Sequence, residues 1–129
     1  MNDFMMNLMK KYLEKYGEAE RICSAAVLKG KWEANASYDT VYVDKTDDLL
    51  LRDALVGQGR ILEEDLDNHV YVDLIRVGKK DMSEALLVLK REDKVVHIGA
   101  YAKEGLIKQH LSKQAVEKAK LFIEKQSEK

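Results

Sequence analysis

The sequence predicts an α+β fold in a single domain covering residues 1–129. Three observations predict it: an amphipathic helical pattern near each terminus, short β-type apolar runs between them, and the absence of internal repeats or low-complexity linkers. The chain has no proline and seven glycines, so its turns must be built from Gly, Asn, Asp and Ser. A chain of this length can bury about two thirds of its unfolded surface, which is enough for one core.

Residues 2–16 are predicted to form the first helix, which Asn2 or Asp3 can cap and Gly17 can end. Four large side chains share one stripe of this helix and are the candidate interface residues: Met5, Met9, Tyr12 and Tyr16. This stripe must pack on its own domain, on a sister subunit or on another partner. With three lysines and two acidic residues, the helix has too small a net positive charge to favour binding to a membrane surface.

Residues 18–101 are predicted to form mainly an antiparallel sheet of about seven strands. The predicted strands are 22–28, 40–44, 49–56, 60–62, 69–77, 84–91 and 94–101. Asp-rich turns at 45–48 and 92–93 are predicted to close hairpins, because Asp tolerates left-handed backbone. The segment 47–56 also fits a capped helix, since its Leu and Ala residues recur at helical spacing, but we favour a strand there.

Residues 104–126 are predicted to form a long closing helix. Its apolar stripe consists of Ile107, Leu111, Ala115, Ala119 and Phe122. Lysines and glutamates between these positions form the opposite, solvated face. Such a stripe predicts that the helix packs along one face of the sheet.

Composition and charge exclude several classes of protein. The 22 basic and 23 acidic residues nearly cancel, and eight carboxylates lie within residues 44–67, which argues against nucleic-acid binding. The longest aliphatic run, residues 85–89, is too short to cross a bilayer, and no secretory signal is recognisable, so a cytoplasmic location is expected. Cys23 is the only cysteine, which excludes an internal disulfide and a cysteine-based zinc site.

The candidate catalytic residues are His69, Asp73 and His97, which neighbouring strands could bring together. The competing interpretation places two histidines on a partly solvated sheet face. No pair of histidines has the local spacing of a metal site, so neither a metal nor a cofactor is predicted. The acidic band is interpreted as solvated surface and turn chemistry, and the chain is expected not to be an enzyme.

The segment Lys29-Gly30-Lys31-Trp32 has two competing interpretations. Lys29 and Lys31 could bind an anionic head group while Trp32 enters an interface, which makes these three the candidate ligand-binding residues. Alternatively, the tryptophan anchors the edge of the core, as an aromatic residue beside a turn often does. Peripheral membrane contact is therefore an outcome that the sequence allows but does not favour.

The order of elements resembles that of bacterial pleckstrin-homology-like domains. Residues 40–51 (TVYVDKTDDLLL) are similar to a strand-turn-strand segment of that family, and residues 61–66 (ILEEDL) to its short turn before a strand. The resemblance implies a bent, barrel-like antiparallel sheet capped by the C-terminal helix, with binding or self-assembly as its activity and no catalytic residues. Eukaryotic members bind phosphoinositides through basic residues of the first hairpin, where this chain offers Lys29 and Lys31.

Two functions from different classes follow. The leading hypothesis is a non-enzymatic binding or scaffolding domain that associates with itself or with another protein. The alternative is a small-molecule-binding protein or enzyme with a pocket between the sheet and the closing helix. A roadblock- or longin-like α/β sandwich is the alternative fold, and it requires residues 47–56 to be a helix.

Overall fold

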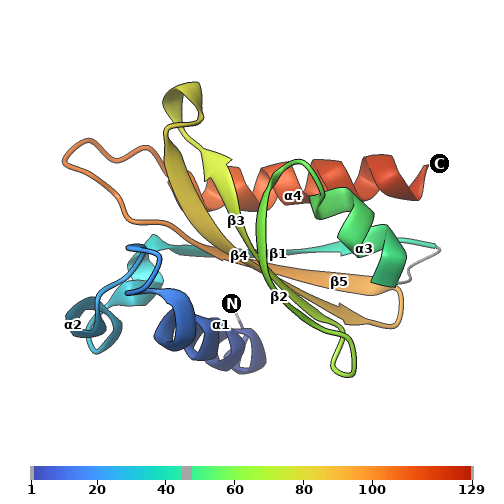
Figure 1. Ribbon diagram of the computed structural model, residues 1–129, viewed down its shortest axis with the longest axis horizontal. Helices are drawn as coiled ribbons and strands as arrows, with labels where there is room; N and C mark the ends of the chain where they lie inside the picture. Colours follow the sequence, from blue (N-terminus) through green and yellow to red (C-terminus); the bar gives the residue numbers. More distant parts are fainter. Residues whose placement is uncertain (1, 45–47, 129) are drawn as a thin grey trace.

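The computed structural model describes residues 2–44 and 48–128 of the chain. Helices and strands follow one another as Figure 1 shows. In chain order the elements are α1 (Asp3–Tyr16), α2 (Ala25–Leu28), η1 (Trp32–Asn35), β1 (Ala36–Tyr42), α3 (Asp48–Leu55), β2 (Gly59–Asp65), β3 (Val70–Val77), η2 (Lys79–Asp81), β4 (Ser83–Glu92), β5 (Val95–Tyr101) and α4 (Leu111–Ser127).

The strands form one open antiparallel sheet in the order β1-β5-β4-β3-β2. Each of β2, β3 and β4 pairs with the next strand in the sequence, and β5 then pairs with β1. Although β1 and β2 are consecutive in the sequence, they lie at opposite edges of the sheet. The connection that contains α3 therefore crosses the sheet from one edge to the other.

Helices cover both faces of this sheet. α1 packs on β4 and β5 at one face, which we call the α1 face. α4 packs across β1, β5, β4 and β3 at the other, which we call the α4 face, and α3 packs beside it. In Figure 1, α1 lies below the strands and α4 above them.

Strand β4 shows what two covered faces require of a sequence. Residues 85–89 are five consecutive aliphatic residues, and all are fully buried. Leu86 and Val88 pack in the core of the α1 face, whereas Leu87 and Leu89 pack in the core of the α4 face. A strand buried on both sides has no polar alternation, which accounts for this uninterrupted run.

The first helix was predicted correctly. The side chain of Asn2 caps α1 by accepting a hydrogen bond from the Met5 backbone N–H at 2.8 Å. Gly17 follows the helix, and a Cβ at that position would lie 2.4 Å from the Leu13 carbonyl oxygen and 2.8 Å from that of Cys23. The chain can therefore turn here only because residue 17 has no side chain.

Two predicted strands are helices, so the sheet has five strands rather than about seven. Residues 48–55 form α3, in which Leu51, Ala54 and Leu55 are buried and Leu49 is exposed. That pattern has helical spacing, whereas alternation along a strand would have placed Asp53 beside Leu51. Residues 25–28 form the short helix α2, because the Ser24 hydroxyl accepts a hydrogen bond from the Val27 backbone N–H.

The remaining strand predictions were correct in position but inexact in length. β1 begins four residues earlier than predicted, and β2 extends three residues further. The turn predicted at 92–93 joins β4 to β5, with Glu92 opposite Val95. Of the turn predicted at 45–48, residues 45–47 lie outside the described residues, and residue 48 begins a helix rather than a strand.

The closing helix begins at Leu111 instead of residue 104. Its apolar stripe from Leu111 through Ala115 and Ala119 is buried as predicted, but Ile107 is 82% exposed and lies outside the helix. His110 has a left-handed backbone with φ of 58°, which interrupts helical geometry immediately before α4. Residues 103–110 therefore form a connection rather than the first turns of a helix.

None of the helices in the described part of the chain combines the length and hydropathy needed to cross a membrane.

Candidate binding surface at one end of the sheet

The three candidate catalytic residues do not meet. Asp73 lies between Tyr71 and Ile75, two residues of the α4-face core, and shares their side of the strand. His97 lies on the α1 face, since its neighbours Val96 and Ile98 belong to the α4-face core. The sheet therefore separates His97 from Asp73, and the structure does not bring the three candidate residues together.

His97 and His69 have separate structural partners. The Nδ1 atom of His97 lies 2.6 Å from the Tyr38 hydroxyl, and its Nε2 lies 3.6 Å from a Glu92 carboxylate oxygen. The Nδ1 atom of His69 lies 3.2 Å from the Asp48 carboxylate at the start of α3. Each imidazole thus joins neighbouring elements, as the structural interpretation of the histidines expects.

Asp48 forms the centre of a small ion-pair cluster. Its Oδ1 lies 3.6 Å from Arg91 Nε on β4, and its carbonyl oxygen accepts a hydrogen bond from the Tyr71 hydroxyl at 3.2 Å. Burial raises the pKa of Asp48, but Tyr71, His69 and Arg91 outweigh this effect and hold that pKa below its usual value. The cluster fixes the first turn of α3 to β3 and β4.

Asp73 is the most perturbed carboxyl group of the chain's described part. It is 0% exposed, and neither carboxylate oxygen has a hydrogen-bond partner among the described residues. Burial raises the pKa of Asp73 to about 7, while the Leu74 backbone and the Arg60 charge act weakly in the opposite direction. No solute reaches this group in the folded chain, so its position is that of a core residue.

The candidate ligand-binding residues are divided between the core and solvent. Trp32 is 3% exposed and belongs to the core of the α1 face, whereas Lys29 and Lys31 are exposed. The buried indole cannot enter an interface together with the two ammonium groups. The structure therefore agrees with the tryptophan as an anchor of the core.

The apolar face of α1 is already covered by its own chain. Met5, Met9 and Tyr12 are 0% exposed, and α1 packs on β4 and β5. The half-buried Tyr16 donates a hydrogen bond from its hydroxyl to Glu63 at 2.6 Å. The stripe that was expected to offer an intermolecular interface therefore packs against the sheet of its own chain.

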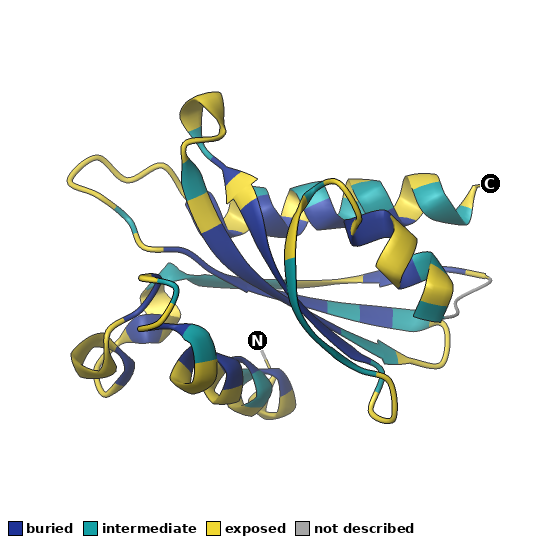
Figure 2. Cartoon of the chain, in the orientation of Figure 1, coloured by how far each residue is buried: buried dark blue, intermediate teal, exposed yellow. Residues whose placement is uncertain are grey.

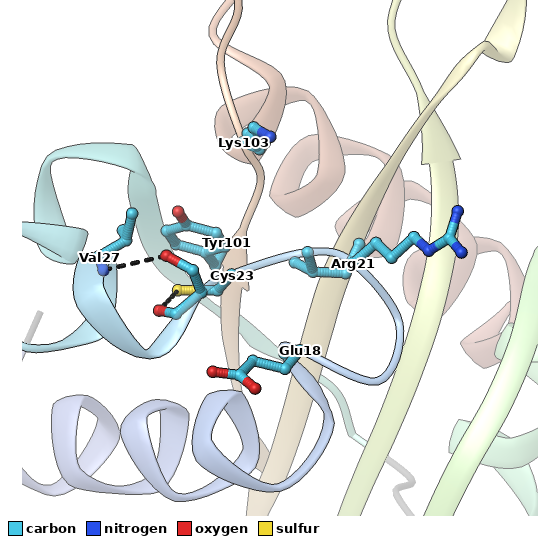
Figure 3. A pocket seen from close by; sticks show the side chains of 9 residues that line it. Glu18, Arg21, Cys23, Val27, Tyr101 and Lys103 are labelled. Atoms are coloured by element: carbon cyan, nitrogen blue, oxygen red, sulfur yellow. Dashed lines mark hydrogen bonds between the residues drawn. The ribbon is translucent and has the colours of Figure 1, made fainter.

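A cavity of about 280 Å³ opens between the α1–α2 connection and the end of β5. Ile22, Cys23, Val27 and Tyr101 give it an apolar wall, and Figure 3 shows Cys23 against the Tyr101 ring with Arg21 pointing away from both. Burial raises the pKa of the Cys23 thiol, which keeps it protonated and weakly nucleophilic. The cavity therefore has the character of an apolar recess without a nucleophile.

Two connections project from the same end of the sheet, where β3 turns into β4 and β5 leaves for α4. Residues 78–82 and residues 103–110 together are called the loop end. Gly78 joins their bases to the start of α4: its backbone N–H donates to Gln114 Oε1 at 3.0 Å, and a Cβ on it would lie 3.4 Å from Gln109 Oε1 of the second connection. Figure 2 shows both connections as largely exposed.

Large aliphatic side chains are exposed on both connections of the loop end. Leu106 is 108% exposed, Ile107 is 82% exposed and Met82 is 81% exposed. These three have the highest exposed fractions among the large apolar residues of the described chain. Scattered exposed apolar residues are normal, but three such residues on two connections at one end of the sheet form a candidate binding surface.

Glu104 fixes the shape of the longer connection. Its Oε1 accepts hydrogen bonds from the backbone N–H groups of Gln109 at 2.6 Å and His110 at 3.1 Å, and its Oε2 accepts one from Leu111 at 2.8 Å. Burial raises the pKa of Glu104, but these backbone donors outweigh it and lower the pKa below its usual value. The carboxylate thus closes the connection at its base and caps α4 at the same time.

Sequence reasoning missed the residues that form this surface. Ile107 was placed in the apolar stripe of the closing helix, and Met82 and Leu106 were assigned no role. Gly105 was the available signal, because a glycine two residues before Ile107 disfavours a helix there. Glu104 accepts hydrogen bonds from backbone N–H groups five to seven residues later in the chain, a spacing that matches no regular capping pattern and so gives no sequence signal.

Within the residues that the structure describes, no three His, Cys, Asp or Glu side chains form a group able to hold a metal ion. No protein-family model, curated protein or solved structure matches the chain.

Proposed function

We propose that the chain is a non-enzymatic binding module that attaches to its partner through the loop end. One observation carries the proposal: Leu106 and Ile107 are exposed at the tip of a connection whose base Glu104 fixes with three hydrogen bonds. Exposing two large aliphatic side chains to water costs free energy that burial against a partner would recover. Because Glu104 already holds the connection in one shape, binding would order little additional backbone.

The alternative function has less support. A small-molecule pocket was expected between the sheet and the closing helix, but core side chains such as Leu87, Ile98 and Ala115 fill the interior of that interface. A recess of about 260 Å³ remains at its margin, where Val77 at the end of β3 lies near Glu117 and Lys118 of α4. The apolar cavity of about 280 Å³ lies elsewhere, at the α1–α2 connection. The candidate catalytic residues His69 and His97 have separate structural partners, which also favours binding over catalysis.

At the level of fold family, we propose a roadblock- or longin-like α/β sandwich rather than a pleckstrin-homology-like barrel. The sandwich requires a helix at 47–56, and the helix at Asp48–Leu55 supports it. Helices on both faces of an open sheet support the same proposal.

A site-specific photo-crosslinker tests the proposed function in the cells that produce the protein. A diazirine-bearing amino acid would replace Leu106, and the matched control would carry it in place of Leu66, which is also exposed but lies at the other end of the sheet. We expect a discrete crosslinked product, to protein or to lipid, from position 106 and none from position 66. Equal products from both positions, or none from either, would overturn the proposal.

A further inference from the structure

Resting on the proposed function, we infer that the partner of the loop end is an anionic membrane surface. Leu106, Ile107 and Met82 would enter the boundary between head groups and acyl chains, and nearby lysines would meet the lipid phosphates. Three properties of the loop end carry this inference: its protruding connections (Figure 2), its excess of lysines over carboxylates, and its contrast with the opposite end of the sheet.

The apolar side chains stand on protruding connections and not in a groove. Leu106, at 108% exposure, has essentially no protein neighbour to shield it. A folded protein partner would need a matching pocket for each tip, whereas a bilayer accepts protruding aliphatic groups at any lateral position. Two exposed connections at one end of the sheet, one with Leu106 and Ile107 and the other with Met82, therefore suit a fluid apolar phase.

The loop end has four lysines but only two acidic side chains, and both acidic side chains have partners within the chain. Glu104 accepts three backbone hydrogen bonds, and the Asp81 carboxylate lies 3.3 Å from the Lys118 ammonium. Within the described ranges 2–44 and 48–128, no ion pair involves the four lysines of the loop end. These are Lys79, Lys80, Lys103 and Lys108.

These lysines lie close in sequence to the apolar tips. Lys108 follows Ile107 directly, Lys103 lies three residues before Leu106, and Lys80 lies two residues before Met82. A lysine side chain can extend its apolar stem along an interface while the ammonium group remains among phosphates. Each lysine near an anionic leaflet adds attraction that salt screens.

The opposite end of the sheet also exposes leucines, but among carboxylates. Residues 65–69 and 92–94, which we call the turn end, carry Leu66 at 56% exposure beside Asp65 and Asp67. Leu49, at 65% exposure, follows Asp48, whose contact with His69 places it at the same end. An anionic surface would repel this end, so the two ends together fix the orientation of the chain on a membrane.

Flotation with lipid vesicles tests the inference on the full chain. The probes are phosphatidylcholine vesicles with and without about one third phosphatidylglycerol, at low and high salt. We expect binding to the anionic vesicles, at least about tenfold weaker binding to the neutral ones, and loss of binding at high salt. Leu106→Ser with Ile107→Ser should weaken the partition coefficient by at least about tenfold.

Matched variants separate insertion, charge and folding. Lys103→Glu with Lys108→Glu should reduce partition into anionic vesicles by at least about tenfold. Leu49→Ser with Leu66→Ser removes two exposed leucines at the turn end and should leave partition unchanged. Circular dichroism should show wild-type secondary structure for all three, because every substituted side chain is exposed.

The outcomes distinguish this inference from the proposed function. Absence of vesicle binding, or equal loss from the loop-end and turn-end variants, would overturn the membrane inference. If the crosslinker at position 106 then captures one protein, or a second copy of this chain, the binding function stands with a different partner. If the chain binds no vesicles and the crosslinker gives no product, both proposals fail.

Discussion

Strands β2 and β3 each carry a carboxyl group that faces a helix-covered side of the sheet, and the two groups lie in opposite environments. Glu63 on the α1 face accepts hydrogen bonds from Lys15 Nζ at 2.5 Å and the Tyr16 hydroxyl at 2.6 Å. Asp73 on the α4 face is fully buried without a hydrogen-bond partner among the described residues. The surroundings of Glu63 stabilise the charged carboxylate, whereas those of Asp73 favour the neutral carboxyl group.

This difference follows from what covers each group. α1 ends near the edge strand β2, so the polar ends of Lys15 and Tyr16 reach Glu63 at the rim of the core. Asp73 lies on the second strand, where its neighbours on the same side are Tyr71 and Ile75 and its cross-strand partner is Leu87. The α1 face therefore has a polar rim, whereas the α4 face contains a carboxyl group within its apolar core.

The largest expected effect comes from removing the buried carboxyl group. The pKa of Asp73 is about 7 in the folded chain against 3.8 for an unperturbed group. Between these values the unfolded chain loses its proton and the folded chain keeps it, so stability falls as pH rises. The total loss is at most about 4 kcal/mol of unfolding free energy, and it levels off above pH 7.

Asp73→Asn should abolish most of this dependence and should unfold at higher denaturant concentration than wild type at pH 8. Urea unfolding at several pH values, monitored by circular dichroism, measures this pH dependence of the unfolding free energy. Asp67→Asn, on an exposed turn, is the matched control and should keep the wild-type profile. If the unfolding free energy of Asp73→Asn fell with pH as steeply as that of wild type, Asp73 would not be the source of the dependence, and the contrast with Glu63 would fail.

A second prediction concerns how tightly α1 approaches the sheet. A Cβ at Gly99 would lie 2.8 Å from Met9 Sδ and 3.2 Å from Met5 Cε, so the methionines pack directly on the glycine. Gly99→Val should lower the unfolding free energy by about 1–3 kcal/mol through overpacking. Met side chains are flexible, so the value should lie toward the lower end.

A double-mutant cycle checks that the cost arises at this contact. Met9→Ala creates space above residue 99, so the double variant should be less destabilised than the sum of the single variants by about 1 kcal/mol. Strict additivity would mean that α1 moves as a whole and that the methionines do not determine its distance from the sheet.

Much of this two-sided arrangement could be predicted from the sequence. The cap at Asn2, the stripe of Met5 and Met9, and the aliphatic run at 85–89 all have regular local signals, and each is found as predicted. The same run also indicates two covered faces, because a strand open to water on one side alternates. The segment 49–56 was assigned wrongly because its six apolar residues among eight positions fit both a helix and a strand.

The candidate binding surface could not be predicted, for a different physical reason. Leu106 and Ile107 are exposed because Glu104 draws three backbone N–H groups onto its carboxylate and delays the start of α4. Where α4 begins depends on tertiary geometry, including the contact of Gly78 with Gln114. Likewise, the separation of His97 from Asp73 depends on which helix covers which face.

The smallest expected effect is at Glu63, and its pH dependence has the opposite sign to that of Asp73. The hydrogen bonds from Lys15 and then Tyr16 hold the pKa of Glu63 below its usual value of 4.5. Its contribution is therefore present above pH 4.5 and is lost as pH falls through the lower, folded-state pKa. Glu63→Gln should cost no more than about 1 kcal/mol at pH 6 and should flatten only the acid side of the stability profile.

Asp39, Asp48 and Asp65 also have lowered pKa values, so Glu63→Gln should remove only part of the acid-side loss. With Asp73 acting from the neutral side, the wild-type chain should be most stable between about pH 4 and pH 5. The variant Glu63→Gln with Asp73→Asn should have a broader maximum than either single variant, because each substitution flattens a different side. A maximum that stays near pH 7 in the wild type would refute the contrast between the two faces.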